Sequence, residues 1–227
     1  MCAGRLYLVA TPIGNLGDMT YRAVEVLKSV DLIAAEDTRR AKKLMSHYDV
    51  TAHVVSYHSH NEHKKTGELI EKLQSGTNIA LVTDAGMPCV ADPGFLIARA
   101  AIAVGIEPEI IPGVSATTFA VAAAGVPVDR FTFVGFLAPK SAKRQRQLND
   151  LKEAGETAII FESVHRINKL VSDIATVCGE EQDVVIIREA TKLHEERIRM
   201  KAGAFAELYK DKKWKGEFVI ILPRSAK

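Results

Sequence analysis

The amino-acid sequence predicts an α/β protein with two domains, a mostly parallel N-terminal sheet and a mixed C-terminal sheet. Short apolar runs typical of buried strands alternate along the chain with stretches of helical periodicity, as in parallel sheets with crossover helices. In the second half, some of these runs follow one another without a full crossover helix, which is typical of a mixed sheet. With 227 residues, 47% of them hydrophobic, the chain is long enough to bury a sizeable core.

The first half is expected to alternate strands with helices. The expected strands are the apolar runs at residues 6–10, 32–35, 53–57, 79–83 and 108–111. The expected helices lie between them, at residues 20–29, 38–47, 62–74 and 93–104. Because each helix separates two strands, largely parallel pairing is expected in this part of the chain.

The second half opens with an alanine-rich helix at residues 115–124. The strands expected after it are residues 131–136, 158–161, 184–187, 197–201 and 218–222. The further expected helices are residues 142–154, 166–177 and a short one near 205–209. The change in pattern places the boundary near residues 111–114, which gives domains of residues 1–112 and 113–227. A cleft between two such domains is a common place for a ligand.

The cysteines and the apolar runs indicate the cellular setting. Cys2, Cys89 and Cys178 lie far apart and form neither a CxxC pair nor a Cys/His pair at ligand spacing. Neither a disulfide framework nor a zinc site is therefore expected, and no metal is assigned. A reducing, cytoplasmic location is the default. No signal peptide is expected, and no apolar stretch approaches the length of a membrane span.

The net charge of +2 is too small to identify a nucleic-acid partner by itself. Basic side chains nevertheless gather in three places along the chain. These local clusters are residues 39–43, 140–146 and 210–215. Each cluster alone is more typical of a solvated helix face or turn than of a track for phosphates.

The most informative stretch is residues 83–88, which leads into residues 91–94 and is followed about one helix later by residues 112–116. Both turns come at the ends of strand-like runs, where open α/β sheets place their ligands. Glycine and proline in these turns let the backbone approach a ligand and fix the turn, while Asp84 supplies a carboxylate and Ser115 a hydroxyl. The sequence therefore predicts a binding site at these two turns.

Helix capping is the alternative interpretation of the polar residues around these turns. Asp92 and Ser115 would then cap helices, with Pro93 at the first helical position. The same alternative applies at the other strand ends to Asp37 or Thr38, Asn61 and Ser163.

Polar residues also follow other strand-like runs. The turn at residues 11–18 contains glycine but matches neither GxGxxG nor a P-loop, which disfavours a dinucleotide site. Residues 36–40, 58–61 and 162–166 combine His, Arg and carboxylate side chains. Three such clusters at one end of the strands indicate a polar substrate with phosphate or hydroxyl groups.

Six ordered motifs closely resemble the pattern of the bacterial small-subunit ribosomal RNA 2′-O-methyltransferases, a family within the tetrapyrrole methylase superfamily. The motifs are residues 8–18, 35–39, 57–62, 84–88, 112–116 and 161–166. The resemblance runs from Arg5 to about Leu222, and it implies a class III methyltransferase fold, a homodimer, and S-adenosylmethionine bound in the cleft between two domains. It departs at the C-terminus, because the family's members usually continue into a small helical tail, whereas this sequence ends at Lys227.

The resemblance also implies roles for individual residues. Its cofactor contacts fall on Pro12, Asp84, Met87, Ser115 and Ala116, with Phe161 and Glu162 closing the site from the second domain. Candidates for the base that removes the hydroxyl proton are Glu162, His165, Asp37 and His58. Candidate substrate contacts, including guanidinium groups suited to phosphates, are Asn15, Arg39, Arg40, His60, Asn61 and Arg166.

The implied activity is S-adenosylmethionine-dependent methylation of the ribose 2′-hydroxyl of a cytidine in the decoding region of small-subunit ribosomal RNA, in the assembled subunit. One alternative is methylation of a tetrapyrrole precursor, which fits residues 36–39 and 58–61 less well than RNA does. Another is a non-catalytic RNA-binding protein, against which the intact turns at Asp84 and at residues 112–113 argue.

Overall fold

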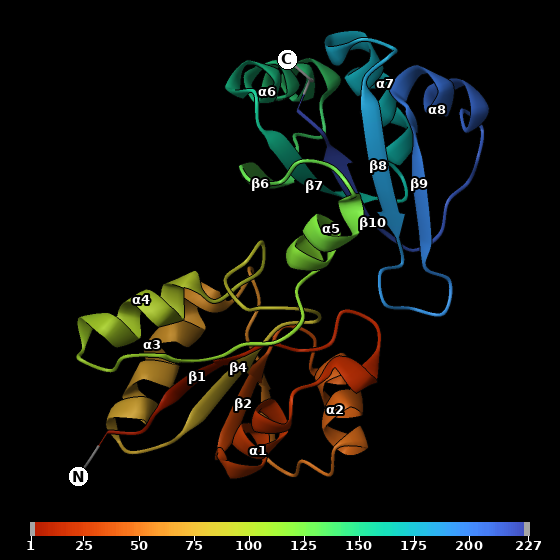
Figure 1. The fold of residues 1–227 in the computed structure, drawn as a ribbon. Coiled ribbons are helices and arrows are strands. Elements are labelled where there is room, and N and C mark those ends of the chain that lie inside the picture. Colours follow the sequence, from red (N-terminus) through yellow and green to blue (C-terminus); the bar gives the residue numbers. More distant parts are fainter. Residues whose placement is uncertain (1–2, 225–227) are drawn as a thin grey trace. The chain divides into compact units, whose positions relative to one another are not determined.

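The computed structural model describes residues 3–224 and divides the chain into two compact units, Met1–Ser115 and Ala116–Lys227. Each unit contains one five-stranded sheet (Figure 1). The division lies a few residues beyond the boundary expected after residue 112.

Unit 1 is built on a parallel sheet in the order β3-β2-β4-β1-β5. Its strands are β1 (Leu6–Val9), β2 (Leu32–Ala35), β3 (His53–Ser56), β4 (Ile79–Val82) and β5 (Glu109–Ile111). Every neighbouring pair is parallel, as the alternation of strands and helices predicts. The carboxyl ends of all these strands therefore meet at one edge of the sheet.

Helices cover both faces of this sheet (Figure 1). These helices are α1 (Tyr21–Ser29), α2 (Thr38–His47), α3 (Glu62–Gln74) and α4 (Phe95–Ala103). Alternate strand residues such as Ile33 pack with α1 and α2, and their neighbours such as Ala34 pack with α3 and α4. Because both faces are covered, the central strands are apolar at every position, and each large side chain buried there contributes roughly 1.5–3 kcal/mol.

The structure corrects the expected start of α4. This helix begins at Phe95 after Gly94, so Pro93 is not its first residue and Asp92 does not cap it. Gly94 has φ of 135°, and a Cβ there would lie 2.8 Å from Cys89 Sγ. The chain makes a tight turn before the helix, and that turn requires glycine. A 3₁₀ helix, η1 (Leu16–Asp18), was also not expected.

Unit 2 contains the expected mixed sheet, in the order β6-β7-β10-β8-β9. Its strands are β6 (Phe131–Phe136), β7 (Thr157–Ser163), β8 (Asp183–Arg188), β9 (Glu196–Lys201) and β10 (Glu217–Leu222). Strands β6 and β7 are parallel, whereas the other neighbouring pairs are antiparallel. The carboxyl ends of β6 and β7 therefore lie next to each other.

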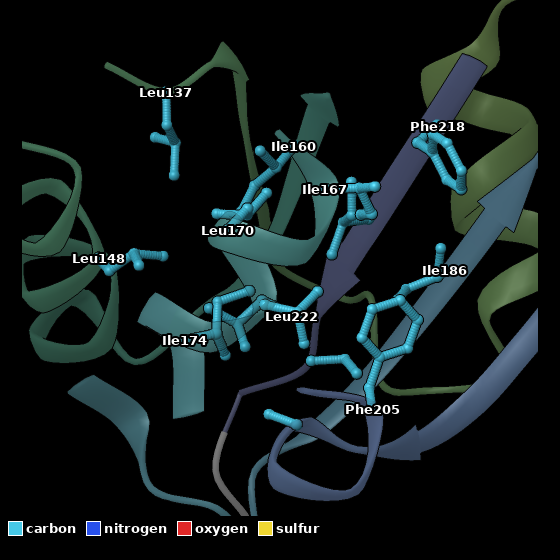
Figure 2. Packing of buried hydrophobic residues seen from close by; sticks show 14 of the residues in the cluster. Leu137, Leu148, Ile160, Ile167, Leu170, Ile174, Ile186, Phe205, Phe218 and Leu222 are labelled. Atoms are coloured by element: carbon cyan, nitrogen blue, oxygen red, sulfur yellow. The ribbon is translucent and has the colours of Figure 1, made fainter. Parts of the chain in front are cut away.

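The helices of unit 2 are α5 (Ala116–Ala124), α6 (Ser141–Ala154), α7 (Ile167–Cys178) and α8 (Ala202–Leu208). Helix α5 packs on one face of the sheet, and the other three pack on the opposite face. Figure 2 shows part of the core on that opposite face, where Leu148, Leu170 and Phe205 meet strand residues such as Ile160. Helix α7 begins at Ile167, four residues after the expected cap Ser163, so Ser163 does not cap it.

Among residues 3–224, no helix is both long enough and apolar enough to cross a lipid bilayer. Within the same stretch, no group of three or more His, Cys, Asp or Glu side chains is placed to hold a metal ion. Cys89 and Cys178 are free thiols whose pKa is raised by burial, which disfavours their reactive thiolate forms. Cys2 lies outside the described residues.

Candidate active site

Three turns lie side by side at the carboxyl edge of the unit 1 sheet, because β4, β1 and β5 are neighbours. Thr11, after β1, and Gly86, after β4, exchange backbone hydrogen bonds of 2.9 and 3.0 Å. Gly113, after β5, passes so close to β1 that an added Cβ would lie 2.8 Å from the Cβ of Ala10. The edge therefore presents closely packed backbone with few bulky side chains, as ligand sites of open α/β sheets do.

Asp84 connects this group of turns to the end of β2. Its Oδ1 accepts a hydrogen bond of 3.1 Å from the backbone N–H of Asp37, and its Oδ2 lies 3.2 Å from Arg40 Nη1. The backbone N–H of Asp84 in turn donates to Glu36 Oε2 at 3.4 Å. A partly exposed ion pair of this kind contributes about 0–1 kcal/mol to folding. Its main consequence is to fix the positions of the two turns.

Asp37 has the capping role that the alternative interpretation gives it. Its Oδ1 accepts from the N–H of Arg39 at 2.8 Å, at the start of α2. The same carboxylate accepts two hydrogen bonds from the Arg39 guanidinium, of 2.8 and 3.1 Å. These bonds hold the pKa of Asp37 well below its usual range. A carboxylate that binds a proton so weakly is a poor general base.

The turn after β3 is held together by Asn61. Its Oδ1 accepts from the backbone N–H of His58 at 2.8 Å, and its Nδ2 donates to Ser56 Oγ at 3.1 Å. Asn61 precedes α3, but its side chain makes no capping bond to that helix. The rings of His58 and His60 are 5.8 Å apart. His58 Nδ1 is buried and has no hydrogen-bond partner among residues 3–224.

A carboxylate cluster beside this turn was not found from the sequence. Glu36 and Asp92 line a pocket of about 430 Å³ together with Glu62 and His63. Burial raises the pKa of Asp92 to about 6, and the nearby charges of Glu36 and Asp84 add to this effect. The sequence left open whether residues 91–94 belong to a binding site or whether Asp92 caps a helix, and no local pattern shows that Asp92 lies near the ends of β2 and β4.

Replacing Asp92 by asparagine is expected to raise the melting temperature at pH 8. The folded protein holds the Asp92 proton up to a pH of about 6, whereas the unfolded chain releases it near its ordinary pKa of 3.8. The ionised carboxylate therefore destabilises the fold increasingly as pH rises through this window. Because Asp92 is only half-buried, we expect a gain of about 1 kcal/mol, or roughly 2–4 °C, above pH 7.

Thermal unfolding of the wild type and of Asp92→Asn at pH 8 and at pH 4 checks this expectation. The difference is expected to shrink to a small fraction of its pH 8 value at pH 4, where the carboxyl is protonated in the folded state and about 40% protonated in the unfolded chain. An equal gain at both pH values would show that Asp92 acts through packing and not through its charge.

Glu162 lies at the carboxyl end of β7 in unit 2, with only 3% of the residue exposed. Its Oε1 accepts from the backbone N–H of Ser163 at 2.7 Å and from Arg166 Nε at 2.8 Å. Its Oε2 is buried and has no hydrogen-bond partner within residues 3–224. Phe161 packs its ring against Phe133, with centroids 4.9 Å apart. The structure therefore brings Phe161, Glu162 and Arg166 together.

The other candidate residues fall into groups according to the strand that each one follows. Pro12 and Met87 follow β1 and β4 beside Asp84, and Ser115 and Ala116 come shortly after β5. Arg39 and Arg40 follow β2, while His60 and Asn61 follow β3. The expected cofactor residues of unit 1 thus follow the adjacent strands β4, β1 and β5. Most of the expected substrate residues of unit 1 follow β2 and β3, on the other side of β4. Some candidates differ in their surroundings: Pro12 is buried, Asn15 caps η1 through Gly17, and His165 is exposed.

Comparison with known proteins gives close relatives over nearly the whole chain. A Synechocystis protein is 46% identical over 219 residues, which cover 96% of this chain and 78% of the relative. A protein of Escherichia coli O157:H7 is 44% identical over 221 residues, covering 96% of this chain and 77% of that protein. A Bacillus subtilis protein is 41% identical over 222 residues, covering 98% and 76%. All three are named ribosomal RNA small subunit methyltransferase I.

The fold is similar to that of a diphthine synthase crystal structure, with a TM-score of 0.79 over 97% of this chain and 90% of that chain. Only 18% of the residues are identical, so this likeness concerns the fold alone. The sequence profile of the tetrapyrrole (corrin/porphyrin) methylases matches residues 5–206. Together with the relatives, this match shows that the chain belongs to the tetrapyrrole methylase family.

Proposed function

We propose that this protein is a methyltransferase that uses S-adenosylmethionine to methylate small-subunit ribosomal RNA at the ribose 2′-hydroxyl of a cytidine in the decoding region. The observation that carries the proposal is the identity of 41–46%, over almost the whole chain, to relatives named ribosomal RNA small subunit methyltransferase I. Membership of a methylase family supports the same reaction type. The choice of cytidine and of the 2′-hydroxyl rests on the six sequence motifs.

The three adjacent turns of unit 1 fit a methyl donor of this kind. Backbone hydrogen bonds between Thr11 and Gly86 and the close approach at Gly113 bring the turns together at the sheet edge where open α/β proteins bind ligands. When bound, S-adenosylmethionine supplies an electrophilic methyl group on a sulfonium sulfur. We assign its contacts to the residues predicted from the motifs, namely Pro12, Asp84, Met87, Ser115, Ala116, Phe161 and Glu162. That the donor is bound between the two domains stays a prediction.

The remaining tasks of the chain are to hold the ribose and to accept its hydroxyl proton. Glu162 offers a buried Oε2 that has no hydrogen-bond partner in the described part of the chain, while Arg166 fixes the carboxylate through Oε1. We assign the role of general base to Glu162, because Asp37 accepts hydrogen bonds from the Arg39 guanidinium and the His165 side chain is exposed. Arg39 and Arg40, both exposed, contact phosphates of the RNA.

The functional proposal is tested in a bacterial strain that lacks this ribose methylation. A plasmid carrying the wild-type gene restores the 2′-O-methyl group, which is detected by mass spectrometry of the ribosomal RNA, in assembled subunits. A ribose that stays unmethylated, although the expressed protein binds S-adenosylmethionine, would overturn the RNA assignment.

The same proposal includes a homodimer. The motif resemblance implies one, and exposed apolar side chains on α4 and on the edge strand β5, including Phe95, Ile102 and Ile110, support it. Light scattering at tens of micromolar, where typical enzyme dimers persist, is expected to give twice the chain mass of 24.8 kDa. A monomeric mass at that concentration would remove this part of the proposal.

A further inference from the structure

Phe136 is an exposed aromatic side chain at the carboxyl end of β6, with 57% of the residue accessible to solvent. It pairs in register with Phe161 of β7, and their ring centroids are 5.9 Å apart. Phe136 therefore lies at the same edge of the unit 2 sheet as Glu162. No part of the proposed methyl transfer described above uses this ring.

A β-bulge determines which face of the sheet Phe136 occupies. The register of β6 against β7 shifts between Phe133 and Gly135, where Gly135 has φ of 62°. Strict alternation would place Phe136 on the face of Val134, which packs into the core beneath α6 and α7. The bulge instead returns it to the face of Phe133 and Phe161. The fold thus directs this ring away from the core under α6, α7 and α8 and onto the face of the sheet on which α5 packs.

The segment that follows Phe136 is held firmly. Arg166 Nη1 donates to the carbonyl of Leu137 at 3.3 Å. Arg144 Nη1 donates to the next two carbonyls, of residues 138 and 139, at 3.3 and 3.0 Å. Arg144 is only 2% exposed and is fixed by Asp173, with Nε and Oδ2 2.7 Å apart. A ring on such a segment loses little conformational freedom when it binds a partner.

The charge that follows Phe136 in the chain favours an anionic partner. Lys140, Lys143 and Arg146 are exposed and lie just after Phe136 in the chain, at the start of α6. None of the three forms an ion pair within residues 3–224, so their charges are available to phosphates. An exposed ring together with unpaired cations on the same segment of the chain is a combination with which proteins hold single-stranded nucleic acid, because every base offers a face for stacking.

We propose that Phe136 stacks against an unpaired base of the RNA substrate, while Lys140, Lys143 and Arg146 contact the phosphates beside that base. This inference rests on the proposed function. It adds a residue that binds the RNA substrate, and it specifies whether the bound RNA is single-stranded or a duplex. The substrate is a splayed, single-stranded nucleotide and not a duplex, whose stacked bases cannot reach the ring.

The test compares Phe136→Ala, Phe136→Trp and, as a matched control, Phe131→Ala, which removes another exposed ring from the opposite end of β6. Loss of stacking is expected to raise the KM for small subunits about 5- to 100-fold in Phe136→Ala, with little change in kcat. Tryptophan restores the KM, and Phe131→Ala leaves it unchanged. Calorimetry is expected to give the same affinity for S-adenosylmethionine in every variant.

The result that overturns the proposal is an unchanged KM in Phe136→Ala. Weaker binding of S-adenosylmethionine in that variant also overturns it, since the ring would then contact the methyl donor. An equal rise of KM in Phe131→Ala, or no rescue by tryptophan, would show a structural effect instead. If the wild type does not methylate RNA, the proposed function fails independently of this inference. Fluorescence anisotropy then still compares the affinities of the variants for a single-stranded RNA oligonucleotide.

Discussion

Replacing Glu162 by glutamine is expected to lower kcat for RNA methylation by about 10²- to 10⁴-fold, the usual contribution of a positioned general base. The amide oxygen can still accept the hydrogen bonds from Arg166 and from the N–H of Ser163, so the local structure is retained. The buried position of Oε2, however, loses its ability to take a proton. Single-turnover kinetics with pre-bound RNA measure the chemical step directly.

Glu153→Gln is the matched control, because it makes the same chemical change on the exposed side of α6. Its kcat is expected to equal that of the wild type. The affinities of Glu162→Gln for S-adenosylmethionine and for RNA are expected to change less than its kcat. A kcat for Glu162→Gln within a few-fold of the wild type would remove Glu162 from the role of base. It would leave His58, whose Nδ1 is also unpartnered among the described residues, as the next candidate.

Asp84→Ala is expected to weaken S-adenosylmethionine binding by at least about tenfold, which corresponds to about 1.4 kcal/mol. The substitution removes the proposed carboxylate contact. It also removes the acceptor for the N–H of Asp37 and the partner of Arg40, so the turns after β2 and β4 lose a mutual connection. Isothermal titration calorimetry with the purified protein measures the change.

Glu109→Ala serves as the control for this variant. Glu109 is also a partly exposed carboxylate of unit 1, with a distance of 3.9 Å to Arg5, but it lies in β5 and away from the turns. Asp84→Asn keeps a hydrogen-bond acceptor and removes the charge, so it separates the two contributions. If Asp84→Ala binds the donor as tightly as the wild type does, the donor is not bound at this edge of the sheet.

The central strands of unit 1 could be predicted because burial on both faces requires apolar residues at every position. Residues 79–82 are apolar without interruption, and they form β4 in the centre of the sheet. The start of α4 could not be predicted in the same way. Asp92 and Pro93 have the residue types of a helix start, but the chain packs into a tight turn that only Gly94 completes before Phe95.

The polar ends of the strands could also be predicted, since parallel strands carry their carboxyl ends to one edge. The order of the strands could not. The sequence gives no sign that β1 lies between β4 and β5, and this order is what makes the turns at Thr11, Gly86 and Gly113 neighbours. The position of Asp92 near Glu36 and Asp84 depends on the same order and was missed for the same reason.

Phe136 shows a different limit of sequence reasoning. Alternation along β6 would assign it to the face of Val134, and only the pairing of β6 with β7 reveals the bulge. Gly135 was the available signal, because a glycine inside a strand pattern often marks a bulge. Such a glycine can be assigned to a bulge only when the partner strand and its register are known.

The most direct test of the central claim is methyl transfer with purified components. Small ribosomal subunits from a strain lacking the modification are incubated with this protein and with S-adenosylmethionine that carries an isotopically heavy methyl group, and the RNA is then digested to nucleosides for mass spectrometry. The predicted result is heavy methyl on the ribose of a cytidine, located in the decoding region and absent with Glu162→Gln. Heavy methyl on a base, or no labelled nucleoside although the donor binds, would contradict the account.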